Sequence, residues 1–165
     1  MDWDNQRLIS SQFYPPDVPS EWYLTYYANL ITACVISPQK WQMADEQQIQ
    51  QWLTDTQENF WFYLLCESAD DVVQATQKMT EFKTKFAGLV LAASVDLDMN
   101  IPSVDILVMG REVFNYDATS LRQAKPALMQ WLASEACSQH ALILVSADQA
   151  HQVQEVQTLL ELLGN

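Results

Sequence analysis

The chain has 165 residues, 49% hydrophobic and 18% charged, with a formal net charge of −13 at pH 7. This length and composition predict one globular domain, 1–165, with enough apolar side chains for a sizeable core. Eight basic residues against 21 acidic ones argue against nucleic acid or an anionic membrane as a partner, because both require clustered Lys or Arg. The three glycines are too few for a phosphate-binding loop, so we expect no nucleotide or dinucleotide cofactor.

The first segments in chain order predict a strand, a loop, a helix and a second strand. Residues 8–14 have strand propensity and stop at the proline-rich loop 14–19, which fits neither a helix nor a central strand. Ser20 offers an N-cap for a helix over 21–30. The short, β-branched segment 32–36 predicts the second strand.

The middle of the chain continues this alternation. Apolar residues spaced by three and four predict a helix over 45–56. The unbroken apolar run 60–66 is typical of a strand that is covered on both faces, as in parallel sheets. A helix is expected next over 70–86, with Gly88 as the residue that ends it.

The last part of the chain predicts two further strands at 89–93 and 104–108, followed by a helix within 119–139. A strand at 141–145 comes next, and an amphipathic helix over 153–163 ends the pattern. Six strands that alternate with helices predict an α/β fold with a parallel sheet and helical crossovers. Two architectures fit this order of about six βα units: an incomplete TIM-barrel-like sheet, or an open three-layer α/β sheet.

Three segments carry a resemblance to a known family. Residues 14–28 read YPPDVPSEWYLTYYA and resemble the opening of the YecE-like family, also catalogued as domain of unknown function 72. Residues 51–62 (QWLTDTQENFWF) and 86–91 (FAGLVL) are similar to later segments of that family, so the resemblance covers about the first 90 residues. It implies successive units of a TIM-barrel-like fold.

This chain departs from the family at its polar signatures. The family carries a Glu and an Asn in its barrel mouth, where this sequence has Cys34 and Ile36. A later Glu-x-Arg-His segment corresponds to 109–112, where only Arg111 matches. A closed barrel also needs eight strands and roughly 200 residues or more. The resemblance therefore implies a divergent, shortened relative and transfers no catalytic residue.

Polar residues that follow strands are the candidate site residues, because ligands bind at the carboxyl ends of parallel strands. Arg111, Glu112 and Asp148 are the candidate catalytic residues. Asp96 and Asp98 have the spacing that opens a calcium loop, but the later Gly and Glu are missing, which favours an acidic turn over a weak metal site. The other polar residues after strands are Ser37, Glu67, Ser94 and Ser146.

The cysteines predict the compartment and the absence of structural zinc. Cys34, Cys66 and Cys137 are scattered in apolar stretches, which is typical of buried, reduced thiols, and no close pair such as Cys-x-x-Cys occurs. The sequence opens on polar residues without signal-peptide character, and no apolar run reaches the ~20 residues of a membrane span. We expect a cytoplasmic protein.

Two function classes remain open. The predicted helix over 21–30 has more aromatic residues than one buried stripe accommodates, so Trp22 or Tyr26 is expected at a protein interface. This favours a noncatalytic interaction or assembly protein, as a homodimer or with a protein partner. The alternative is a small hydrolase- or isomerase-type enzyme with a site around Arg111, Glu112 and Asp148.

Overall fold

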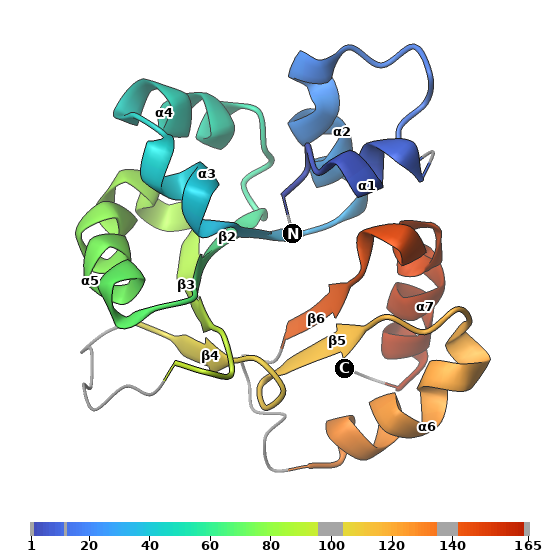
Figure 1. Ribbon diagram of the computed structural model, residues 1–165. Helices are drawn as coiled ribbons and strands as arrows, with labels where there is room; N and C mark the ends of the chain where they lie inside the picture. Colours follow the sequence, from blue (N-terminus) through green and yellow to red (C-terminus); the bar gives the residue numbers. More distant parts are fainter. Residues whose placement is uncertain (1, 12, 96–103, 135–141, 164–165) are drawn as a thin grey trace.

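The apolar strand segments assemble into two parallel sheets in the computed structural model, which describes residues 2–11, 13–95, 104–134 and 142–163 (Figure 1). The larger sheet has the order β1-β2-β3-β4, all parallel. Its strands are β1 (Ala33–Ile36), β2 (Trp61–Cys66), β3 (Phe86–Leu91) and β4 (Ile106–Val108). The smaller sheet pairs β5 (Val113–Tyr116) in parallel with β6 (Leu142–Val145).

Helices connect most of these strands, as the alternation predicted. Those before β2 are α1 (Gln6–Ser10), the 3₁₀ helix η1 (Ser20–Trp22), α2 (Tyr23–Leu30), α3 (Pro38–Met43) and α4 (Glu46–Thr54). Those after β2 are α5 (Ala69–Lys78), the 3₁₀ helix η2 (Met79–Lys85), α6 (Leu121–Leu132), the 3₁₀ helix η3 (Ala147–Gln152) and α7 (Val153–Leu163). The α/β class with a parallel sheet is therefore confirmed.

Strict side-chain alternation gives each sheet an inner and an outer face. In β2, for example, Phe62 and Leu64 pack in the main core with the helices, whereas Tyr63 and Leu65 point to the opposite face. The opposite faces of both sheets meet in one second core. Its members are Val35, Tyr63, Leu65, Val90, Leu107, Met109, Val113, Leu142 and Leu144. The two sheets thus share an inner layer, and helices cover their outer faces.

The strand predicted at 141–145 is β6, but it belongs to the smaller sheet and not to the larger one. It was expected beside the strands at 60–66, 89–93 and 104–108, which do pair in parallel with one another. Instead, β6 pairs with β5, a strand that the sequence pattern did not predict. The chain passes from β4 to β5 through the short turn 109–112 and so leaves the larger sheet. The prediction of a single sheet is therefore wrong for this last strand.

The first predicted strand is also wrong, because residues 6–10 form helix α1. The Asn5 side chain caps this helix by accepting a hydrogen bond from the Arg7 N–H, at 2.9 Å. Tertiary contacts add to this local cap: Leu8 is buried in the main core, and Ile9 packs partly against it.

The helix predicted over 70–86 ends earlier than expected. α5 stops at Lys78 and passes into η2, and Phe86 begins β3. Gly88 is consequently a strand residue, not the end of a helix. The helix expected within 119–139 is α6, and residues 135–139 lie outside the described part of the chain.

Candidate functional site

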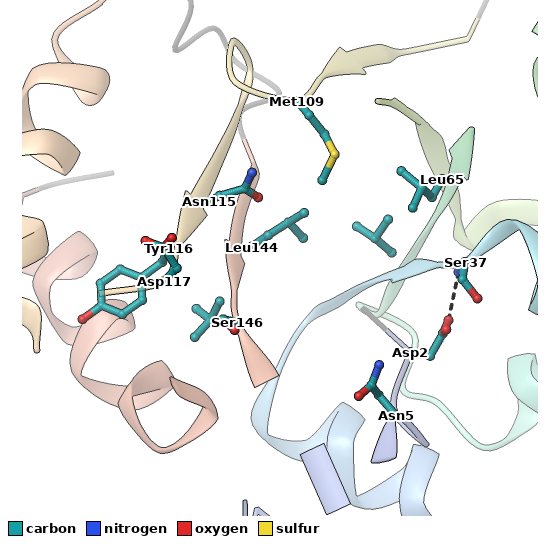
Figure 2. Close-up of a pocket in the computed structure, with 12 residues that line it drawn as sticks. Asp2, Asn5, Ser37, Leu65, Met109, Asn115, Tyr116, Asp117, Leu144 and Ser146 are labelled. Carbon is teal, nitrogen blue, oxygen red and sulfur yellow. Dashed lines mark hydrogen bonds between the residues drawn. The ribbon is translucent and has the colours of Figure 1, made fainter. Parts of the chain in front are cut away.

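A cavity of about 430 Å³ lies between the edge strands of the two sheets, β1 and β6 (Figure 2). It is lined by residues of the N-terminal segment, both sheets and the loops that follow them. These residues are Asp2, Asn5, Val35, Ser37, Leu65, Met109, Asn115, Tyr116, Asp117, Leu144, Val145 and Ser146.

The cavity opens at the carboxyl ends of the strands. Ser37 directly follows β1, Asp117 directly follows β5, and Ser146 directly follows β6. Parallel strands leave their last backbone groups and the following loops at one common end, which is where α/β proteins hold ligands. The position of the cavity therefore follows from the parallel topology.

The inner face of the sheets supplies its apolar floor. Val35, Leu65 and Leu144 belong to the shared inner core and also line the cavity. Asn115 occupies the next inward position after Val113 on β5, and its amide points toward the cavity in Figure 2. The lining is thus apolar toward the core and polar toward the mouth.

The N-terminal segment forms the third wall. One carboxylate oxygen of Asp2 accepts a hydrogen bond from the Ser37 N–H at 2.9 Å, drawn as the dashed line in Figure 2. The segment is anchored by Trp3, which is buried and makes an edge contact with Trp52 at 5.1 Å between ring centroids. The Lys40 ammonium lies 4.2 Å from the Trp3 ring centroid and pairs with Asp4. Asp2 is therefore held in place at the mouth by the packing of its neighbours.

A buried hydrogen bond fixes the opposite wall. The Tyr116 hydroxyl donates to Oε1 of Gln152, and both side chains are buried. Burial, with a contribution from Glu155, raises the pKa of Tyr116 above its ordinary value, so this phenol stays protonated and remains a donor. The contact ties the end of β5 to η3 behind the cavity.

Several polar groups of the lining have no partner within the described residues. The Ser37 and Ser146 hydroxyls, the Asn115 amide and the Asp117 carboxylate form no hydrogen bond to other described side chains or backbone groups. Asp2 and Asp117 are carboxylates, and the described residues of the lining include no Lys, Arg or His. The mouth of the cavity thus presents solvent-accessible polar groups together with negative charge.

The three candidate catalytic residues do not come together. Arg111 and Glu112 lie in the turn before β5 and form an ion pair of 3.2 Å. The other Glu112 oxygen accepts from the Val108 N–H at 3.0 Å, so this carboxylate serves the turn itself. The Glu112 carbonyl bonds to the first residue of β6, whereas Asp148 is exposed in η3 beyond the end of β6. The length of β6, about 13 Å, therefore separates the Glu112 backbone from Asp148.

Other predicted site residues lie elsewhere or outside the described chain. Asp96 and Asp98 are outside the described residues. Within the ranges that are described, no three His, Cys, Asp or Glu side chains form a group that could hold a metal ion. Of the remaining residues expected after strands, Ser37 and Ser146 line the cavity.

The predicted interface residues differ in exposure. The Trp22 side chain is 62% exposed at the end of η1. Tyr26 is half-buried and contacts the rings of Phe13 and Tyr14 at 5.9 and 5.6 Å between centroids. Trp22 is thus the exposed member of this aromatic segment.

The two described cysteines are buried in the main core. Burial is the main reason that the pKa of Cys34 and that of Cys66 are each raised to about 12. A thiol with such a pKa is almost fully protonated at pH 7 and is a poor nucleophile or metal ligand. Cys137 lies outside the described residues.

Sequence reasoning missed four polar residues of the cavity. Asn115 lies on β5 and Asp117 directly follows it, and the β-prone segment Val113–Tyr116 was the signal that could have found them. Asp2 and Asn5 reach the cavity only through packing of the N-terminal segment, for which the sequence pattern has no local signal.

No helix formed by the described residues is long and apolar enough to cross a membrane. Comparisons of the chain with protein-family models, with curated proteins and with solved structures found no match. The resemblance to the YecE-like family therefore stays a prediction.

Proposed function

We propose that this chain is a noncatalytic interaction protein that docks a protein partner through Trp22. The observation that carries the proposal is the 62% exposure of this large apolar ring, while its neighbours Tyr23 and Leu24 pack inward. Tryptophan is among the residues most enriched at the energetic centres of protein interfaces.

The residues that follow Trp22 in the chain are well packed, which favours binding. Tyr23 stacks on Tyr14 with 4.2 Å between ring centroids, and Tyr27 contacts Phe60 at 6.3 Å. A binding residue whose backbone is fixed by packed neighbours has less conformational freedom to lose when a partner covers it. The arrangement therefore favours Trp22 as a docking residue over a merely tolerated surface side chain.

The surroundings of Trp22 indicate the chemistry of the partner. Asp17 and Glu21 are exposed in the same loop and helix turn, and the chain carries a net charge of −13. A partner with an apolar pocket and a basic rim complements this surface. The charge opposes self-association over long range, although it is screened beyond about 8 Å at physiological salt. A homodimer is therefore the less favoured form of the same proposal.

The proposal includes the fold of the chain, which we assign as an incomplete TIM-barrel-like fold related to the YecE-like family. Two parallel sheets with a shared inner core and outer helices support this assignment. β1 and β6 are the edge strands at which the sheet would have to close. The buried thiols of Cys34 and Cys66 suit a reducing compartment, which supports a cytoplasmic location.

The test compares the wild-type chain with Trp22→Ala and with Met43→Ala, which removes another exposed apolar side chain of 85% exposure. Each tagged protein is incubated with an extract of the host cell, and the captured proteins are quantified by mass spectrometry. We expect one partner that Met43→Ala retains and Trp22→Ala loses by about tenfold or more. Equal capture by all three proteins would contradict the proposal.

Light scattering at micromolar concentration separates the two forms of assembly. A monomer of 18.9 kDa that forms a one-to-one complex with the captured partner supports the heteromeric form. A dimer that Trp22→Ala dissociates supports the homodimer instead.

A small enzyme of hydrolase or isomerase type is the second candidate, because the cavity lies at the carboxyl ends of the strands. Its test is the turnover of a metabolite panel, followed by NMR, with the wild-type chain and with Asp117→Asn. Turnover that depends on Asp117 would replace the noncatalytic proposal.

A further inference from the structure

We propose that the cavity between β1 and β6 is a binding site for a small organic cation with an apolar body, such as an aryl or alkyl amine. The proposal is independent of docking at Trp22, because it uses other residues on other elements. It rests on the size of the cavity, its apolar floor and the charge at its mouth.

The cavity has the dimensions of a small-molecule site. Its volume of about 430 Å³ falls within the ~300–1,000 Å³ that ligand pockets occupy. Val35, Leu65 and Leu144 form an apolar floor against which a ring or an alkyl chain can pack. Because these side chains come from strands of both sheets, the floor is part of the packed interior and needs no rearrangement.

The charge of the lining selects the sign of the ligand. Asp2 lies beside Ser37 after β1, whereas Asp117 lies beside Tyr116 after β5, and both line the cavity (Figure 2). The described residues of the lining include no Lys, Arg or His that would neutralise them. An ammonium or guanidinium group would form charge-assisted hydrogen bonds with either of these carboxylates. A carboxylate or phosphate ligand would instead face two like charges in a chain of net charge −13.

The uncharged polar groups complete the match. The hydroxyls of Ser37 and Ser146 and the Asn115 amide have no partner among the described residues, so they can accept further hydrogen bonds from an ammonium group. A bare divalent metal ion fits less well, because the described part of the chain brings no three acidic or imidazole ligands together. An organic cation contacts both the apolar floor and the polar mouth, whereas a metal ion would contact only the polar mouth.

A series of three probes of nearly equal size and different charge tests the inference on the wild-type chain. Benzylamine, benzyl alcohol and benzoate are titrated separately into ¹⁵N-labelled protein at pH 7, and binding is followed by NMR chemical shifts. We expect saturable shifts with benzylamine at backbone amides that line the cavity, such as Asn115 and Ser146. Benzyl alcohol should bind about tenfold more weakly, and benzoate should cause no saturable shift there.

Two variants assign the charge selectivity to this cavity. Asp117→Asn and Asp2→Asn each remove one carboxylate, and each should weaken benzylamine binding by about tenfold while leaving benzyl alcohol unchanged. Asp17→Asn is the matched control, because it removes one exposed carboxylate outside the cavity. Thermal melts verify that every variant remains folded.

Three results would overturn the inference. One is equal binding of benzylamine and benzoate by the wild-type chain. A second is saturable shifts confined to amides away from the cavity. The third is an Asp17→Asn variant that loses as much affinity as the two cavity variants, which would show a general charge effect in place of a site.

Discussion

Gly88 lies where β3 closely approaches Asp105, the residue that precedes β4. Its backbone lies on β3, and the Leu89 N–H next to it donates to the Asp105 carbonyl at 2.8 Å. A Cβ atom at this position would lie only 2.4 Å from that carbonyl oxygen. Backbone on both sides cannot yield as a flexible side chain would, so only glycine fits here.

We therefore expect Gly88→Ala to lower the free energy of unfolding by about 3 kcal/mol, through overpacking and backbone strain together. Gly110→Ala is the matched control, because Gly110 has a φ of +84° but no atom within 4 Å of the added Cβ. It should cost only about 1 kcal/mol, the strain of the left-handed backbone alone. Urea unfolding measures both, and equal losses would show that the contact with Asp105 is unimportant.

Lys83 is the reverse case of Gly88: it is not a glycine, but its backbone conformation favours one. Its φ of 53° and ψ of −130° interrupt η2, in a region that L-residues rarely adopt. Its exposed ammonium donates to the half-buried Gln50 side chain at 2.6 Å, a surface contact that contributes little.

Replacing Lys83 by glycine should raise the stability by about 1 kcal/mol, because glycine adopts this conformation without strain. Thr84→Gly, one position along, is the control and should lower the stability by about 0.5–1 kcal/mol through backbone entropy alone. Thermal and urea unfolding would measure both. A loss in both variants would mean that Lys83 is not strained.

At the scale of elements, the N-terminal segment 2–14 joins the two sheets at the mouth of the cavity. The Tyr14 hydroxyl donates to the Trp3 carbonyl, which closes this segment on itself. Helix α1 within it contacts η3, the element that follows β6. The segment thereby covers part of the opening between the edge strands β1 and β6.

Trp3→Ala should therefore be severely destabilising, by about 3–5 kcal/mol, because it empties a buried site between Trp52 and Phe62. Trp22→Ala makes the same chemical change at a side chain that is 62% exposed, and should cost less than about 1 kcal/mol. Equilibrium unfolding of the two variants checks the difference. Similar losses would contradict the proposed independence of Trp22 from the folded core.

At the scale of the whole molecule, several ionisable groups are folded into the core in their neutral form. Burial raises the pKa of the Cys34 and Cys66 thiols from 9.0 to about 12, and that of Tyr27 well above 10.0. The folded chain therefore keeps protons that the unfolded chain releases. Their stabilising contribution is complete below pH 9 and is lost as the pH rises from 9 toward 12.

Stability should fall above pH 9 by about 1.4 kcal/mol per pH unit for each buried thiol. Urea unfolding under reducing conditions at pH 8, 10 and 11 measures this slope. Cys34→Ala should reduce this slope by the contribution of one thiol. It also lowers the free energy of unfolding at every pH, because packing is lost. A variant whose stability runs parallel to that of the wild-type chain would show that Cys34 does not contribute to the pH dependence.

Local patterns in the sequence determined the class of the fold. The apolar runs at 60–66 and 89–93 could be recognised as strands because a strand buried on both faces has no polar positions. Helices spaced between them then required a parallel sheet, because parallel strands need long crossovers. Ser37 and Ser146 were identified for the same reason, since residues that follow parallel strands meet at one end.

Only the tertiary structure decided the rest, because those features depend on contacts between distant segments. Helix α1 forms where its few apolar residues reach the core, and Gly88 is required by the approach of Asp105. The cavity combines Asp2 with Asp117, residues that are adjacent in no local pattern. A sequence pattern records the period of a single element, whereas this cavity arises from the space left where two sheet edges do not meet.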